Sequence, residues 1–208
     1  MIDVKKEAME WLGTLRPDRS RPTFKFWNPR TERELEFYYK YTTSLLIEDA
    51  HHPVPDEVKA FKGRVLEFGG GAGNVAFYLA EKGCTVDYLD INYFQKDFVR
   101  DIRDKYDITN LNIVEQPEGM YDYIILRDVL EHLPNYPETM IFLLSFLRKQ
   151  GQVWIKPEFA TQALPDGKMT FHFKDIKGEG GFDRFMQKFG FEKIGEHLWQ
   201  MKNKSAEN

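Results

Sequence analysis

The feature that most constrains the fold is a run of four glycines within five residues, directly after a short apolar segment. Residues 64–68 have the apolar composition of a strand, the glycines lie between Gly69 and Gly73, and residues 73–82 are amphipathic. Because glycine has no Cβ, a ligand can rest against its backbone and against the N-terminus of the helix that follows. The pattern predicts a strand–loop–helix unit that binds a nucleotide-type ligand.

An acidic residue ends the next apolar run. Residues 84–90 indicate a second strand, which places Asp90 at its carboxyl end. In nucleotide-binding folds, an acidic side chain at this place accepts hydrogen bonds from the ribose hydroxyls. We therefore expect Asp90 to lie near the glycines and to bind the sugar of the ligand.

Strands and helices continue to alternate along the rest of the chain. Further elements are expected as strands at 110–115, 121–127 and 151–156, as helices at 93–105, 137–149 and 180–189, and as two short paired strands within 191–202. Alternation with short connections predicts a parallel sheet with helices on both faces. The expected fold class is α/β, a doubly wound, mostly parallel, seven-stranded sheet.

The chain divides into three segments. Residues 1–55 precede the first strand and contain amphipathic stretches at 1–15 and 31–50, which predict an N-terminal helical cap. Residues 56–202 carry the alternating pattern, and the polar tail at 203–208 is expected to be disordered. A length of 208 residues suits one domain with such an appendage.

Composition narrows the classes of function. The net charge is −4 and the basic residues are dispersed, which argues against nucleic-acid binding. No apolar run approaches the roughly 18 residues that span a bilayer, and the N-terminus lacks the pattern of a signal peptide. The single cysteine, Cys84, excludes an internal disulfide and fits a reducing compartment. We expect a cytoplasmic protein.

Two kinds of ligand are consistent with the glycine loop. Residues 71–76 match a dinucleotide-binding pattern, so a nucleotide-dependent oxidoreductase stays open. However, Glu67 lies two residues before Gly69, where its charge would repel a pyrophosphate and attract a cation, and residues 65–80 contain no basic side chain. These residues favour a cationic ligand.

Three motifs together resemble those of the class I S-adenosylmethionine-dependent methyltransferases. The segment from Glu67 to Gly73 is similar to their first motif, Glu-x-Gly-x-Gly-x-Gly, and residues 89–92 are similar to the second. Residues 121–134 resemble the fourth strand and following turn of the branch that includes quinone-biosynthesis methyltransferases. The resemblance covers about residues 60–200. It implies a Rossmann-like methyltransferase fold and S-adenosylmethionine as the cofactor.

The resemblance also implies the roles of the cofactor-site residues. The glycines would lie against the methionine and ribose portions, and Glu67 would favour the positive end. Asp90 would take both ribose hydroxyls, with Ile91 and Asn92 beside the adenine. For the acidic residue that the family often places at the adenine amino group, the nearest match is Gln116, with Glu115 as the alternative register. The residues expected to bind the cofactor are Glu67, Gly69, Gly70, Gly71, Gly73, Asp90, Ile91, Gln116 and Arg127.

Two residues near the end of the fourth expected strand bear on catalysis. Arg127 would pair with a carboxylate of the cofactor or of an acidic substrate, or alternatively form an internal ion pair with Asp128 or Glu131. Since histidine side chains in general exchange protons near neutral pH, His132 is the candidate for a catalytic base or a substrate contact, the alternative being that it packs the turn.

Other histidines and the aromatic residues support weaker inferences. His172 lies in a stretch similar to one that many relatives carry near the substrate. His51 and His52 are adjacent and chelate poorly together, so no metal site is expected. Aromatic side chains within 24–27 and 37–41 would either line an acceptor pocket or pack as core.

The expected function is methyl transfer from S-adenosylmethionine to an oxygen or nitrogen atom of a small-molecule acceptor. A methyltransferase-like binding or scaffold protein that keeps the cofactor pocket without turnover is the alternative. The sequence predicts neither the acceptor nor the oligomeric state.

Overall fold

The computed structural model describes residues 1–12, 31–33, 46, 50–133, 136–157 and 180–202. The expected helix at 31–50, the tail at 203–208, His172 and the aromatic stretches at 24–27 and 37–41 therefore lie wholly or mostly outside the described residues. Within the described residues, no helix is long and apolar enough to cross a membrane.

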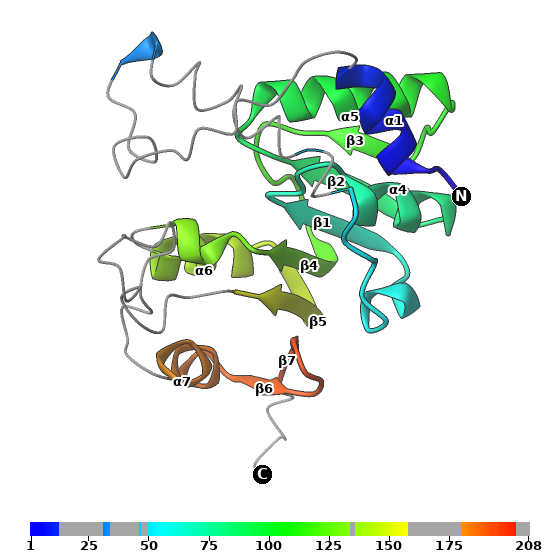
Figure 1. Cartoon of the computed structure of the whole chain (residues 1–208). Helices are drawn as coiled ribbons and strands as arrows, with labels where there is room; N and C mark the ends of the chain where they lie inside the picture. Colours follow the sequence, from blue (N-terminus) through cyan, green and yellow to red (C-terminus); the bar gives the residue numbers. More distant parts are fainter. Residues whose placement is uncertain (13–30, 34–45, 47–49, 134–135, 158–179, 203–208) are drawn as a thin grey trace.

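A seven-stranded sheet runs through the molecule in the order β3-β2-β1-β4-β5-β7-β6 (Figure 1). The strands are β1 Arg64–Phe68, β2 Thr85–Leu89, β3 Leu111–Ile113, β4 Tyr121–Arg127, β5 Leu147–Lys156, β6 Phe191–Lys193 and β7 Leu198–Met201. Strands β1 to β5 pair with one another in parallel, whereas β7 pairs antiparallel with both β5 and β6. The expectation of a mostly parallel, seven-stranded sheet is confirmed.

Helices pack on both faces of this sheet, because consecutive strand residues point to opposite sides. The α-helices are α1 Val4–Leu12, α4 Asn74–Glu81, α5 Tyr93–Lys105, α6 Tyr136–Leu144 and α7 Gly181–Lys188, and η2 Val58–Ala60 and η3 Leu130–His132 are single 3₁₀ turns. Val65 and Trp154 join the core under α1, α4 and α5, whereas Leu66 and Val153 join the core under α6 and α7. The sheet is thus covered on both faces, as the alternation predicts.

One boundary prediction is wrong. The sequence pattern extends a helix over 137–149, but α6 ends at Leu144 and β5 begins at Leu147. Leu147 pairs with Tyr121 at the start of β4, and its side chain is buried in the core under α6 and α7. Tertiary pairing therefore overrides the helical spacing of the apolar residues after Leu144.

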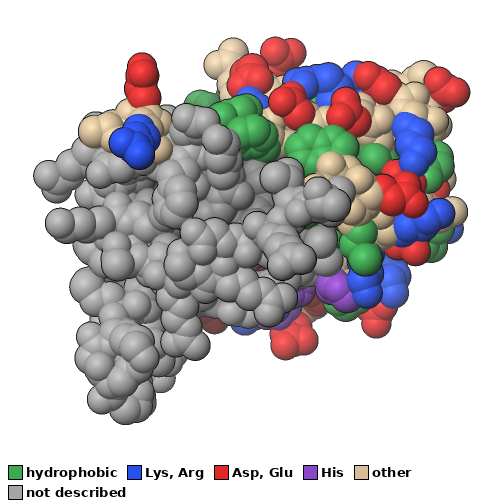
Figure 2. Space-filling model, turned by 45° about the horizontal axis from the view of Figure 1, so that its top comes forward, with side chains coloured by type: hydrophobic (Ala, Val, Ile, Leu, Met, Phe, Trp, Pro, Cys, Tyr) green, Lys and Arg blue, Asp and Glu red, His purple; other side chains and the backbone are tan. Residues whose placement is uncertain are grey.

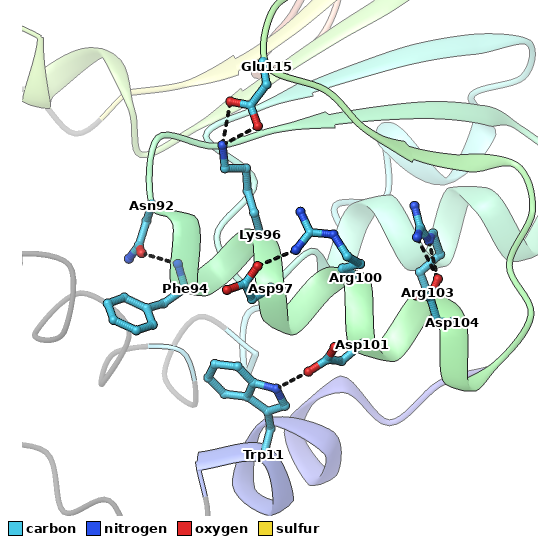
Figure 3. Close-up of polar contacts among 10 residues, drawn as sticks. All are labelled: Trp11, Asn92, Phe94, Lys96, Asp97, Arg100, Asp101, Arg103, Asp104 and Glu115. Atoms are coloured by element: carbon cyan, nitrogen blue, oxygen red, sulfur yellow. Dashed lines mark hydrogen bonds and ion pairs between the residues drawn. The ribbon is translucent and has the colours of Figure 1, made fainter.

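Helix α1 docks on α5 through polar contacts as well as through the core. Trp11 Nε1 donates to Asp101 at 2.8 Å (Figure 3), and the buried Glu7 carboxylate accepts from Lys105 Nζ at 2.6 Å and from the Tyr106 hydroxyl at 2.5 Å. These two donors lower the pKa of Glu7. On the same side, acidic and basic side chains alternate among the described residues (Figure 2), and no strong patch of one sign forms there.

A single buried carboxylate links the four strands β1 to β4 away from their carboxyl ends. Asp87 on β2 is 1% exposed, and its carboxylate accepts a hydrogen bond from Arg64 Nη2 of β1 at 2.7 Å. It also accepts from Asn112 Nδ2 of β3 and from the Tyr121 hydroxyl of β4, each at 2.8 Å. Because every strand contributes one partner, the network holds the strands in register.

Replacing Asp87 with alanine is expected to lower the free energy of unfolding by about 3 kcal/mol, because three polar partners lose their acceptor. Asp104→Ala is the control, since Asp104 pairs with Arg103 on the surface, where such pairs contribute about 0–1 kcal/mol. Urea denaturation measures both variants. Equal losses in the two would contradict the assigned role of Asp87.

Candidate functional site

A cavity of about 480 Å³ opens at the carboxyl ends of β1, β2 and β4, where ligands bind in sheets of this type. Its lining comes from the loop after β1, the β2–α5 turn, the β4–η3 turn and His52, which precedes β1. The described lining residues are His52, Glu67, Phe68, Gly69, Gly70, Gly71, Ala72, Asn74, Val75, Leu89, Asp90, Ile91, Asn92, Gln95, Arg127, Asp128, Val129, His132 and Leu133.

The glycine loop is held at one residue, Gly71, by β2 and the residue that follows it. The Tyr88 hydroxyl donates to the Gly71 carbonyl at 2.6 Å, and the Gly71 amide donates to Asp90 Oδ2 at 3.0 Å. The loop also requires glycine sterically: a Cβ on Gly70 would lie 2.5 Å from the Tyr88 ring, and Gly69 has a φ of 71°. The loop is therefore fixed with bare backbone facing the cavity.

Glu67 is buried at the base of the loop. Its Oε2 accepts from the Ala76 amide at 2.9 Å, which connects the end of β1 to the first turn of α4. Burial raises the pKa of Glu67 to about 8, opposed by the positive charge of Arg127 and by the Ala76 amide. A cation in the cavity would favour the ionised form of this carboxyl group.

Asp90 lies against the loop from the end of β2. Its Oδ1 accepts from the Asn92 amide at 2.8 Å, while Oδ2 accepts from Gly71. Burial raises the pKa of Asp90 to about 6, opposed by these backbone hydrogen bonds. A carboxylate has about four acceptor sites, so capacity remains for ligand hydroxyls on the cavity side.

Arg127 enters the cavity from the end of β4. One guanidinium nitrogen donates to the Pro53 carbonyl at 2.8 Å, and the guanidinium lies 5.7 Å from the centre of the Trp154 ring. The next residue, Asp128, has a φ of 51°, a left-handed conformation that aspartate tolerates better than most residues. Arg127 is thus oriented by the segment before β1 and by β5.

His132 ends η3 and is half-buried in the cavity lining. Its amide donates to the Val129 carbonyl at 3.0 Å, which closes the short turn after β4. On the other side of the glycine loop, the His52 carbonyl accepts from Asn74 Nδ2 at 3.0 Å. The segment before β1 therefore reaches the start of α4 and borders the same cavity.

The structure brings together most of the residues singled out from the sequence, with two exceptions. Gln116 is exposed and is not among the described residues that line the cavity. Gly73 is also absent from that lining and instead precedes α4 with a φ of 72°. Ile91 does line the cavity and is 73% exposed.

Among the lining or supporting residues that sequence reasoning did not place at the site are Tyr88, Gln95 and Asp128. Tyr88 lies two residues before Asp90, so strand alternation places both side chains on one side, and this spacing was an available signal. The cavity position of Gln95 depends on how α5 begins after its Asn92 cap, and no sequence pattern indicates it.

Comparison with known proteins gives a consistent assignment. A family model described as a methyltransferase domain matches residues 39–196. Pavine N-methyltransferase of Thalictrum flavum subsp. glaucum is 26% identical over 100 residues, covering 44% of this chain and 28% of the relative. Phosphoethanolamine N-methyltransferase 1 of Zea mays is 24% identical over 143 residues, covering 63% of this chain and 28% of the relative. The chain thus spans less than a third of the length of these two relatives.

Solved structures share the fold. TehB from Haemophilus influenzae superposes with a TM-score of 0.56 at 16% identity, covering 73% of this chain and 56% of that chain. The mitomycin 7-O-methyltransferase MmcR gives a TM-score of 0.54 at 10% identity, covering 95% of this chain and 66% of that chain. Both likenesses support the seven-stranded architecture described above.

The raised pKa of Glu67 predicts a pH-dependent stability. The pKa of this carboxyl group is 4.5 in the free side chain and about 8 in the fold, so the folded protein binds the proton more tightly than the unfolded chain does. The stability gained from this proton is fully present below pH 4.5. That contribution is lost as the pH rises through about 8, at no more than about 1.4 kcal/mol per pH unit. Urea denaturation between pH 5 and 9 should therefore show wild-type stability falling relative to Glu67→Gln.

The control is Glu115→Gln, which removes an exposed carboxylate bound to Lys96. Its stability difference from wild type is expected to change little over the same pH range. Parallel pH curves for wild type and Glu67→Gln would contradict the buried, protonated state of Glu67.

Proposed function

Since the chain belongs to the methyltransferase domain family, we propose that it transfers a methyl group from S-adenosylmethionine to a small-molecule acceptor, at nitrogen or oxygen. The observation that carries the proposal is the pairing of a fixed glycine loop with two buried carboxyl groups, Glu67 and Asp90, in one cavity.

The cavity suits the charge of this cofactor. S-adenosylmethionine carries a sulfonium and an ammonium against one carboxylate, so its net charge is positive. Glu67, Asp90 and Asp128 are acidic lining residues, and Arg127 is the one Lys or Arg among the described lining residues. The volume of about 480 Å³ lies within the range of small-molecule sites. The residues present therefore fit the group.

Each cofactor-site residue has a proposed role. The backbone of Gly69 to Gly71 would border the methionine and ribose portions, and Asp90 would accept from the ribose hydroxyls. Glu67 would stabilise the positive end through its charge. Arg127 lines the cavity at the end of β4, and its guanidinium would hold the cofactor carboxylate as a charge-assisted partner.

The bound cofactor supplies a methyl carbon already activated by the sulfonium. The protein's part is to place the acceptor atom in line with that carbon, so that its lone pair forms the new bond as the carbon–sulfur bond breaks. The electrons of the broken bond remain on sulfur. An acceptor that arrives protonated must also lose a proton, and His132 is the proposed base because its neutral imidazole can accept one near neutral pH.

Nitrogen is the favoured acceptor atom. The two similar proteins from Thalictrum flavum and Zea mays are named N-methyltransferases, although MmcR is named an O-methyltransferase. The Asp128 carboxylate in the lining would also attract a positively charged amine to the cavity. We therefore propose small amines first and hydroxyl compounds second.

A turnover assay with His132→Ala tests the proposal. A panel of small amines and phenols is incubated with S-adenosylmethionine, and the formation of S-adenosylhomocysteine is measured. With the best acceptor, the variant should lower kcat by about 10²–10⁴-fold while S-adenosylhomocysteine affinity changes little, because a base acts on the acceptor.

His197→Ala is the control, since His197 packs on Trp154 from the turn before β7 and does not line the cavity. Cofactor binding by wild type without turnover of any acceptor would contradict enzymatic function and favour a binding protein. Unchanged kcat in His132→Ala would remove the base assignment alone.

A further inference from the structure

The Glu57 carboxylate ties the segment before β1 to one end of the sheet. Its Oε2 accepts from the Trp154 indole Nε1 of β5 at 2.8 Å, and its Oε1 accepts from the Glu196 amide, in the β6–β7 turn, at 2.7 Å. Strands β5, β7 and β6 lie side by side at this end of the sheet (Figure 1). Glu57 is not among the described residues that line the cavity, so it holds three chain segments together from outside it.

The contacts of this carboxylate are close on both sides. A Cβ on Gly195, in the β6–β7 turn, would lie 2.0 Å from Glu57 Oε1, so a side chain there would displace the carboxylate. Trp154 is 1% exposed, and a buried indole N–H is unfavourable unless it finds an acceptor. Because Glu57 supplies that acceptor, it helps to fix the orientation of the Trp154 ring.

Two contacts of Arg127 depend on this carboxylate. The Arg127 guanidinium lies 5.7 Å from the centre of the Trp154 ring, and its Nη2 donates to the Pro53 carbonyl at 2.8 Å. Glu57 binds Trp154 directly, and it anchors the chain a few residues after Pro53. Glu57 can therefore act on Arg127 through an aromatic ring on one side and through the backbone on the other.

We propose that Glu57 is a positioning residue for Arg127 and, through it, for the carboxylate of the cofactor. The inference rests on the function proposed above, in which the Arg127 guanidinium holds that carboxylate. A guanidinium is planar, and its donors match a carboxylate only in a suitable orientation, so the direction of the group matters as well as its charge. Glu57 fixes that direction without lining the cavity.

Calorimetric titration with two ligands tests the inference: S-adenosylhomocysteine, and its analogue with hydrogen in place of the carboxylate. The quantity compared is the carboxylate preference, which is the dissociation constant of the analogue divided by that of S-adenosylhomocysteine. Wild type should show a preference of at least about tenfold, because hydrogen bonds between charged groups contribute this much. Arg127→Gln should reduce the preference to about one, since the charged partner of the carboxylate is gone.

Glu57→Gln should also lower the preference. Both partners of the Glu57 carboxylate are donors, whereas a glutamine side chain has one oxygen, so its NH₂ group must face either Trp154 Nε1 or the Glu196 amide. The expected decrease is at least about threefold, and it should disappear when Arg127 is already replaced by glutamine, because Glu57 acts through Arg127. A general structural defect would weaken both ligands and leave the preference unchanged.

A second variant reaches the same carboxylate from the β6–β7 turn. Gly195→Ala places a Cβ against Glu57 Oε1 and should lower the preference in the same direction. Glu192→Gln, at an exposed position on β6, is the matched control and should change neither Tm nor the preference. Thermal denaturation shows which variants are folded at the temperature of the titration.

The outcomes separate this inference from the proposed function. Wild type that fails to bind S-adenosylhomocysteine overturns the proposed function and this inference with it. An Arg127→Gln variant that keeps the preference overturns the carboxylate role of Arg127, on which the inference depends. If Arg127→Gln loses the preference, an unchanged preference in Glu57→Gln overturns the inference alone, and Gly195→Ala decides in the same way where Glu57→Gln does not fold.

Discussion

The site depends on how Gly71 is held on both sides of its Cα. Asp90 accepts from its amide side and Tyr88 donates to its carbonyl side, so two residues of one short segment fix the glycine loop. This is possible because β1 and β2 are parallel neighbours, with Phe68 paired to Leu89 at their carboxyl ends. The loop after β1 and the acidic residue after β2 are thereby brought together although they are about twenty residues apart.

Buried carboxyl groups at the two ends of the strands are in different environments. Asp87 has three side-chain partners, including Arg64, and serves to hold the sheet together. Glu67 and Asp90 accept mainly from backbone amides, and burial raises the pKa of each. Two buried acidic groups with raised pKa values therefore lie at the cavity, where a cationic ligand would stabilise their charge.

Much of the fold could be predicted from the sequence because each strand is a short apolar run with its own boundary signals. The expected strand at 64–68 agrees with β1, and Asp90 lies beside the glycines as expected. The end of α6 was predicted wrongly, since pairing of Leu147 with Tyr121 is a tertiary contact. Gln95 was missed for a related reason: which helix residue faces a cavity depends on the cap and packing of α5. The branch that includes quinone-biosynthesis enzymes and the role of each site residue stay predictions.

Calorimetric titration of the purified protein tests most directly whether this cavity binds a sulfonium nucleoside. S-adenosylmethionine and S-adenosylhomocysteine are titrated separately, with NAD as the comparison ligand. We predict dissociation constants on the order of micromolar for the first two and no measurable binding of NAD. Binding of NAD in preference to both, or no binding of either S-adenosylmethionine or S-adenosylhomocysteine, would contradict this prediction.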